Sequence, residues 1–411
     1  MPMCPRCGQP PGSRWFCRHC GAALQPEDPA LRSHRAKRVR RWLLWTAAAA
    51  VTLCMALLIA AALDFNPAAL GLSVLAAFVP AVIYSWLVLR LDRYEKEPRR
   101  VILGAFAWGA IGAVVLALIL ETITGSVLMF AIRDSAASFV SSAIGAPIIE
   151  ETTKGIALLA LLRWFRDEFD DVLDGVIYGA LIGLGFAMTE NTLYFGSEYL
   201  RDGANGLGRL FIARVVISGF GHAVYTATTG AAFGWSREQP GNSRLRRVVP
   251  TLGWSLAVFQ HFLWNGTLLV IDGLVGNNAS IFKVLLIQAP LFVLPPLIVL
   301  FTIARMSAGK ELRILSDELR PEVDGGALTR EEYAVLTSDR LRKSQTEWSR
   351  AHGGREQVKR QRQFFQAAAE LAFEKRSLAR GDRRGPASLP PDAYRAELAA
   401  LRTQLIGKGA R

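Results

Sequence analysis

The chain has 411 residues and a formal net charge of +13, with 51% hydrophobic and 20% charged residues. Apolar stretches of about 20 residues recur between Trp42 and Ala304, and this length lets a helix cross a hydrocarbon core of roughly 30 Å. Basic residues gather beside the ends of these stretches, as orientation charges of membrane proteins do. Composition and charge therefore exclude an ordinary soluble protein and a nucleic-acid partner.

The N-terminal segment 1–25 contains two C-x-x-C motifs, each followed by a glycine. Each motif can present two thiolates to a tetrahedral ion, so the sequence predicts a zinc ribbon. The predicted ligands of this structural zinc are Cys4, Cys7, Cys17 and Cys20. Disulfide pairing is the alternative, and the reducing compartment expected for this end disfavours it. A basic linker, 26–41, follows the ribbon.

The transmembrane domain is predicted to cover 42–304 and to contain about eight helical spans. The predicted spans are 42–63, 68–90, 101–122, 138–162, 172–196, 209–235, 248–271 and 283–304. The stretch 123–137 is apolar in part but too short to cross, and we expect a re-entrant or interfacial piece there. The fold class is therefore an all-α bundle of membrane-spanning helices.

Charge places both termini on one side of the membrane. Arginine and lysine clusters follow the even-numbered spans, whereas the loops 64–67 and 272–282 carry none. Both ends should then face the cytoplasm of a cell-membrane protein that crosses several times. A cleavable signal peptide is not expected, because the first apolar stretch follows the cysteine motifs and is long enough to span.

The tail 305–411 is charged and predicted to be helical and cytosolic. Thr329 and Glu332 form a capping-box pattern before a helix around 333–342. An amphipathic stretch, 357–380, and a short helix, 392–405, follow. Nothing in the tail indicates chemistry, and coiled or partly disordered contacts are the role that its composition favours.

Ionisable residues lie inside the predicted spans, although an ionisable group at the bilayer centre costs roughly 2.5–3.5 kcal/mol. Counting from the span ends places Glu150, His222 and His261 near the midplane. Pairs spaced four apart share a helix face, which favours convergence. Several such groups at one depth predict a shared polar chamber. The candidate residues are Glu150, Glu151, Lys154, Glu190, Asn191, His222, His261 and Asn265.

Four motifs on successive spans carry a family resemblance. They are Glu-Glu-Thr-Thr-Lys at 150–154, Phe-Ala-Met-Thr-Glu-Asn at 186–191, Gly-His at 221–222 and Gln-His-Phe-Leu-Trp-Asn at 260–265. In this order they resemble the PrsW family of intramembrane proteases over about residues 75–305. A more distant similarity is to the CAAX-processing and bacteriocin-processing membrane proteases, although Glu190 stands where that pattern has a histidine. The resemblance implies proteolysis of a membrane-protein substrate, such as a single-span regulator.

Two mechanisms fit these residues. In one, Glu150 is the general base, Glu151 shares its proton or holds structure, and Lys154 balances their charge. Glu190 and His222 then orient the water. The oxyanion donors of this mechanism are His261 and Asn265. In the other, a catalytic divalent metal binds His222, His261 and Glu190, with Glu150 as base. The sequence leaves both open, and Asn191 is a supporting residue in either.

The sequence also leaves three alternatives to a protease open. The polar groups could form a buried hydrogen-bonded network without chemistry. They could also serve a proton-coupled or ion-coupled transporter, since Glu, His and Lys at the midplane build proton relays. The sequence shows no internal repeat of the kind that such transporters have. A membrane scaffold with a zinc ribbon is the third alternative.

Overall fold

The computed structural model describes residues 66–406, with gaps at 93, 95–96, 133, 166–167, 240–242, 276–280 and 380–388, and a few positions between 52 and 64. The predicted zinc ligands Cys4, Cys7, Cys17 and Cys20 lie outside the described residues, and so does almost all of the predicted span 42–63. Both therefore stay predictions. The regular elements among the described residues are all helices, which confirms the predicted fold class.

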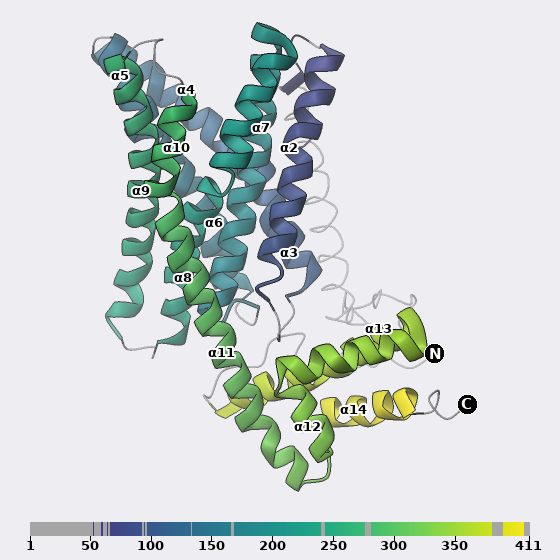
Figure 1. Cartoon of the computed structure of the whole chain (residues 1–411). Coiled ribbons are helices and arrows are strands. Elements are labelled where there is room, and N and C mark those ends of the chain that lie inside the picture. Colours follow the sequence, from purple (N-terminus) through teal and green to yellow (C-terminus); the bar gives the residue numbers. More distant parts are fainter. Residues whose placement is uncertain are drawn as a thin grey trace, which may run out of the picture. The chain divides into compact units, whose positions relative to one another are not determined.

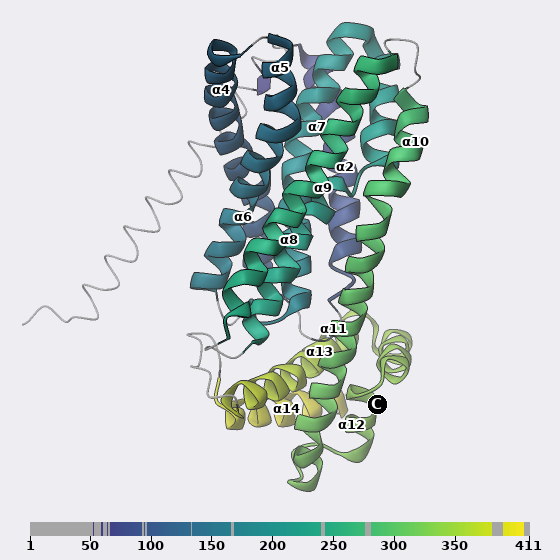
Figure 2. The ribbon, with the colours of Figure 1, turned by 90° about the vertical axis from the view of Figure 1, so that its left-hand side faces the viewer.

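Sixteen helical elements follow one another in the described part, and three of them, labelled η, are π-helical. The first seven are α2 (Pro67–Val88), α3 (Arg99–Ala107), η1 (Trp108–Ala113), α4 (Val114–Ala131), α5 (Asp134–Phe139), η2 (Val140–Gly145) and α6 (Ala146–Trp164). They are followed by α7 (Val172–Phe211), η3 (Ile212–Ile217), α8 (Gly221–Glu238), α9 (Leu245–Val275), α10 (Ile281–Phe292) and α11 (Leu294–Asp324). The tail contains α12 (Arg330–Leu336), α13 (Asp339–Ala379) and α14 (Pro391–Ile406). Figures 1 and 2 show α2 and α7–α10 running alongside one another.

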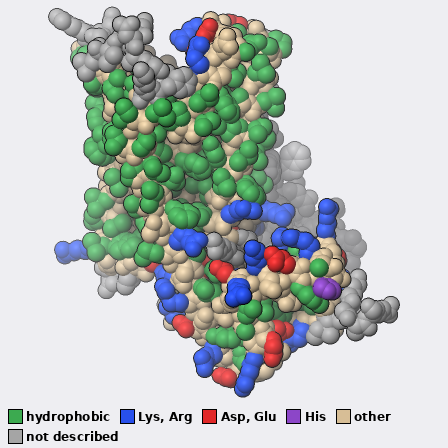
Figure 3. Space-filling model, viewed as in Figure 1, with side chains coloured by type: hydrophobic (Ala, Val, Ile, Leu, Met, Phe, Trp, Pro, Cys, Tyr) green, Lys and Arg blue, Asp and Glu red, His purple; other side chains and the backbone are tan. Residues whose placement is uncertain are grey.

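Five helical stretches among the described residues are long and apolar enough to cross a membrane. They are Pro67–Val88, Arg99–Ala131, Val172–Glu238, Leu245–Ile271 and Val284–Asp324. The stretch Val172–Glu238 contains both the predicted fifth and sixth spans, since its backbone leaves the helical region at Asp202 and Gly203. The predicted fourth span, 138–162, coincides with the helix from α5 to α6. Hydrophobic side chains cover the surface of the bundle in Figure 3, as a lipid-facing surface requires.

The expectation of a re-entrant piece at 123–137 is wrong. Helix α4 runs on to Ala131, and Arg99–Ala131 is one continuous candidate span of 33 residues. The stretch looked too short to cross because the preceding span was ended at residue 122, whereas the same helix continues through it. Thr122 and Ser126 donate their hydroxyls to carbonyls one turn earlier, at 2.6 and 2.8 Å, so neither opens the backbone.

Helices α7 and α8 pack with their backbones in close approach. A Cβ added at Gly175 would lie 2.0 Å from the carbonyl oxygen of Gly230, and one at Gly183 would lie 2.3 Å from that of His222. Only glycine permits this spacing, which is the usual role of small residues between membrane helices. The approach at Gly183 fixes the backbone of His222 against α7.

We expect Gly230→Ala to destabilise the bundle by about 2 kcal/mol, because overpacking forces the two helices apart. A Cβ at this position would lie 1.9 Å from the carbonyl oxygen of Gly175. The measurement is the apparent thermal midpoint of the purified chain in detergent. Gly208→Ala is the matched control on α7, since nothing lies within 4 Å of its added Cβ. Equal midpoints for the two variants would contradict the packing described here.

The tail forms a packed unit and not the loose contacts that its composition favours. Leu315 and Leu319 of α11 share a buried cluster with Phe364 and Leu371 of α13 and Leu398 of α14. Helix α11 carries the chain from the last candidate span into this cluster without a break. The capping box of Thr329 and Glu332 is confirmed at the start of α12. Charged side chains are frequent on the surface of the tail in Figure 3.

Glu322 joins three helices of the tail through ion pairs. The Arg395 guanidinium donates to both of its carboxylate oxygens, at 2.7 and 2.9 Å, and Lys375 donates at 2.7 Å. These bonds, that of Arg395 foremost, lower the pKa of Glu322 to about 2. Because the folded pKa lies below the ordinary value of 4.5, the stabilisation is complete above that pH and is lost as the pH falls toward 2.

We expect Glu322→Gln to lower the local stability of the tail by about 2 kcal/mol at pH 6, since it breaks a buried ion pair. Hydrogen exchange of α14 in the full chain should then accelerate about 30-fold. The difference from the unmodified chain should shrink at pH 3, once intrinsic exchange rates are corrected. Asp392→Asn is the control, because Asp392 pairs with the same arginine from a position 90% exposed. An equal acceleration in both variants would count against the buried pair.

Candidate active site

The predicted polar residues come from four neighbouring helices and surround one cavity. Helix α6 supplies Glu150, Glu151 and Lys154, and α8 supplies His222 as its second residue. The cavity has a volume of about 390 Å³. Six predicted residues line it: Glu150, Glu190, Asn191, His222, His261 and Asn265. Glu151 and Lys154 lie behind this lining and are buried.

Lys154 lies at the centre of the polar cluster. Its Nζ donates to Glu150 Oε2 at 3.0 Å, to Glu151 Oε1 at 2.8 Å and to His222 Nδ1 at 2.9 Å. The side chain is fully buried, and its ammonium also lies 3.9 Å from the centre of the Phe186 ring. One cation therefore holds two carboxylates and an imidazole, which makes two adjacent buried acids tolerable.

The contacts of His222 define its tautomer. Nδ1 accepts from the ammonium of Lys154, so the proton is on Nε2, which donates to Glu190 Oε2 at 2.9 Å. Arg214 binds Glu190 and donates to Asn191 at 2.5 Å. Glu190 is therefore fixed by the guanidinium of Arg214 and by the imidazole of His222.

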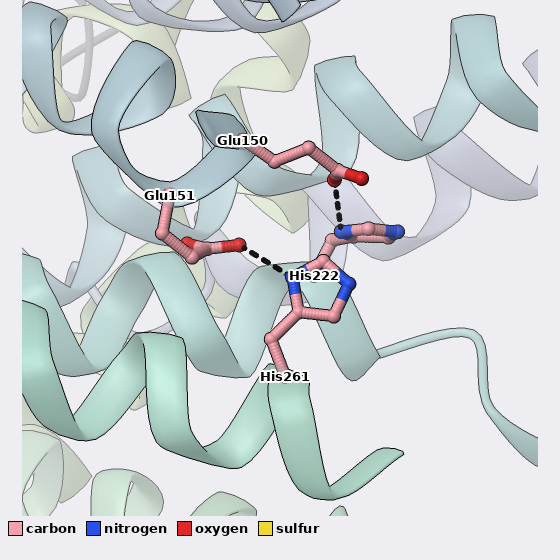
Figure 4. A group of neighbouring side chains, drawn as sticks. All are labelled: Glu150, Glu151, His222 and His261. Carbon is pink, nitrogen blue, oxygen red and sulfur yellow. Dashed lines mark hydrogen bonds and ion pairs between the residues drawn. The ribbon is translucent and has the colours of Figure 1, made fainter. Parts of the chain in front are cut away.

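The two adjacent glutamates of α6 have different surroundings. Glu151 accepts from Lys154, from His261 Nδ1 at 3.2 Å and from the hydroxyl of Thr226 at 3.1 Å. Glu150 faces the cavity and accepts from Lys154, with His222 Nδ1 at 3.8 Å. Figure 4 shows the carboxylate of Glu150 directed at His222 and that of Glu151 at His261. Of the two glutamates, only Glu150 lines the cavity.

The structure adds residues that the motifs did not indicate. The backbone carbonyl oxygen of Ser142, in η2, accepts a hydrogen bond from the side-chain amide of Asn265 at 3.1 Å. The hydroxyl of Thr226 donates to Glu151. Tyr225 lines the cavity, and its ring stacks on His261 with centroids 5.0 Å apart. The available signal was spacing, since Tyr225 follows His222 by three residues and shares its helix face.

Comparisons with known proteins give a family likeness for part of the chain. Residues 97–295 match the model of the PrsW family intramembrane metalloproteases, and this match covers a little under half of the 411 residues. The proteins named Protease PrsW from Clostridioides difficile (strain 630) and Geobacillus kaustophilus (strain HTA426) are each 28% identical to the chain, over 198 and 195 residues. These matches cover 48% and 47% of the chain, and 79% and 78% of the two relatives. Protease PrsW of Bacillus subtilis (strain 168) is 26% identical over 183 residues, or 43% of the chain and 77% of the relative. No solved structure matches the chain significantly.

The PrsW segment contains every residue of the cavity motifs, whereas the cysteine motifs and the tail lie outside it. The candidate spans make the chain a multi-pass membrane protein, and its residues 97–295 are similar to a family of intramembrane proteases. Its helical bundle combines that family's sequence with a polar cavity buried among apolar helices.

The name of the PrsW family implies a metal, so the fit of the cluster to a metal can be tested. Ligand atoms of Glu150, Glu151, His222 and His261 lie within 4.8 Å of one another, and imidazole with carboxylate suits a hydrolytic zinc ion. The ligands predicted from the sequence were His222, His261 and Glu190, so the observed set has the two α6 glutamates in place of Glu190. However, the ammonium of Lys154 donates to three of these four side chains. With the lysine in this position the cluster does not fit a metal ion.

Proposed function

We propose that the chain is an intramembrane endopeptidase that hydrolyses peptide bonds of membrane-protein substrates. The observation that supports this most is that Glu150, Glu190, His222 and His261 line one shared cavity among apolar helices. A peptide bond inside a bilayer can be cut only where water, a base and polar donors meet away from lipid. Similarity to a protease family disfavours the transporter alternative.

In the proposed reaction Glu150 is the general base. It takes a proton from water while the water oxygen adds to the substrate carbonyl carbon, and the carbonyl oxygen becomes the oxyanion. As the carbon–nitrogen bond breaks, the proton passes from Glu150 to the departing amine. Glu151 cannot take this role, because its oxygens already accept from Lys154, His261 and Thr226. Glu190, whose Oε2 is held by Arg214 and by His222, lines the same cavity and positions the water.

Lys154 supplies the positive charge in this mechanism. Its ammonium donates at 2.8–3.0 Å to the groups that a metal would bind, and it holds the His222 lone pair that metal ligation needs. We therefore assign the chain to glutamate-type chemistry without an active-site metal. The cytoplasmic zinc ribbon of Cys4, Cys7, Cys17 and Cys20 stays a structural metal site in this proposal.

Metal analysis tests this assignment. We expect a variant with all four ribbon cysteines replaced by serine to retain cleavage after dialysis against a chelator, and to contain well under one equivalent of metal per chain. One bound equivalent, with activity that the chelator removes and zinc restores, would establish the metal mechanism instead. The unmodified chain is the control, because metal that it contains and the variant lacks is bound by the ribbon.

The proposed substrate is a single-span membrane protein. We also propose that both ends of the protease lie in the cytoplasm, because clusters of arginine and lysine follow the even-numbered spans. The direct test is to reconstitute the purified chain in liposomes with a single-span helix carrying a fluorophore pair. Cleavage that Glu150→Gln removes supports the protease. Proton flux without cleavage would instead favour a transporter.

A further inference from the structure

Helix α8 begins inside the membrane-spanning part, at the wall of the cavity. Residues 218–220 form a turn between η3 and α8, and Ser218 and Gly219 of this turn line the cavity. Tyr84 of α2 stabilises this turn, because its hydroxyl donates to the carbonyl oxygen of Val215 at 2.8 Å. A Cβ at Gly219 would lie 2.2 Å from that same oxygen, so the turn needs a glycine. Non-helical backbone at membrane depth is tolerated where it lines such a cavity.

The first turn of α8 offers backbone donors to this cavity. The first N–H groups of a helix have no partner within the helix and carry its positive dipole end. Gly221 uses its N–H on the carbonyl oxygen of Ser218, at 2.8 Å. Among the described residues no acceptor is found for the N–H groups of His222 and Ala223, and no side chain caps the helix. Both groups point back along the helix toward Ser218 and Gly219.

Tyr225 is an independent observation at the same place. Its side chain is 2% exposed, and its hydroxyl has no hydrogen-bond partner among the described residues. The ring is fixed by stacking on His261 and by an edge contact to His222, with centroids 5.0 and 6.1 Å apart. The hydroxyl lies 3.5 Å from where a Cβ of Gly221 would be, so it points at the start of α8. A buried hydroxyl in this state lacks an acceptor.

The donors suggested by the motifs are less suited to an oxyanion. His261 Nδ1 is bonded to Glu151, and if it donates there, neutral Nε2 carries a lone pair and no proton. One N–H of the Asn265 side-chain amide is already bonded to the carbonyl oxygen of Ser142, which leaves one of its two. The N–H groups of the second and third residues of α8 and the buried Tyr225 hydroxyl have no acceptor among the described residues.

We propose that the Tyr225 hydroxyl and the backbone N–H groups that open α8 form the oxyanion site of the protease. This rests on the proposed function. When water adds to the substrate carbonyl, the carbonyl oxygen gains the electron pair of the broken π bond and accepts hydrogen bonds from the hydroxyl and from the N–H groups of His222 and Ala223. The pair returns to the carbonyl as the amine leaves, so these groups donate without transferring a proton.

The test is Tyr225→Phe in the full chain, assayed in liposomes with the single-span substrate. Loss of one oxyanion donor should lower kcat about 100-fold, and KM should stay within about twofold. The apparent thermal midpoint should not fall, because the hydroxyl removed has no partner in the resting protein. In a Glu150→Gln background the same change should leave the Kd for uncleaved substrate unchanged. Tyr199→Phe, on the outer part of α7 and outside the cavity lining, is the matched control.

The outcomes separate this inference from the proposed function. Unchanged kcat in Tyr225→Phe, together with inactive Glu150→Gln, would overturn the oxyanion site and leave the protease standing. A fall in kcat that tracks a fall in thermal midpoint would show a structural role and also overturn it. A wild-type chain that never cleaves, under conditions where it is folded, would overturn both.

Discussion

Glu150→Gln should abolish proteolysis while leaving the protein folded. The amide cannot accept the proton of the attacking water, and removal of a general base typically costs 10²–10⁴-fold. We expect a loss of about 1,000-fold or more in kcat, with little change in the affinity for substrate. The fold should tolerate the change, because the amide oxygen can still accept from Lys154 and the side chain borders the cavity. Cleavage of the fluorescent single-span substrate in liposomes measures the effect.

The matched control is Glu198→Gln. Glu198 lies on α7 and pairs with Arg201, whose side chain is 77% exposed, and it is not part of the cavity lining. Its removal should change the rate by less than twofold, since surface ion pairs contribute little. A Glu150→Gln protein that retains a tenth or more of the wild-type rate would end the assignment of Glu150 as base.

Much of the site was predictable because ionisable residues inside apolar spans are costly and therefore few. Helical spacing and depth were enough to place Glu150, Glu190, His222 and His261 around one cavity. They also placed Lys154 beside the two glutamates, as the structure has it, but not its contact with the imidazole of His222, 68 residues away in sequence. That contact depends on rotamers and on the close approach of α7 to α8.

The turn before His222 was also beyond sequence analysis. Gly219 and Gly221 read as ordinary small residues of a span, and the period of apolar residues runs through them. Only packing reveals that Gly219 has no room for a side chain and that α8 starts here. The error at 123–137 has a different cause, because the preceding span was ended at residue 122 although its apolar helix continues to Ala131.

We expect Glu151→Gln to lose activity because the protein loses stability, whereas Glu150→Gln should lose activity and stay folded. Glu151 is fully buried, and the change removes the anion that Lys154, His261 and Thr226 all bind. Glu150, by contrast, lines the cavity and binds Lys154. Breaking a buried ion pair by removing one partner typically costs 3–5 kcal/mol. We expect the apparent thermal midpoint of Glu151→Gln to fall well below that of Glu150→Gln, in the same detergent.

The double variant Glu151→Gln with Lys154→Met decides whether charge is the cause. Removing the ammonium together with Glu151 removes one fully buried pair of opposite charges, and such replacements are often close to neutral for stability. The carboxylate that remains, Glu150, lines the cavity, where water can solvate it. The midpoint should therefore recover, while cleavage stays absent because Lys154 no longer holds Glu150 and His222. If the midpoint stays as low as in the single variant, packing and not charge explains the effect. If cleavage returns with the midpoint, the ammonium has no part in the chemistry.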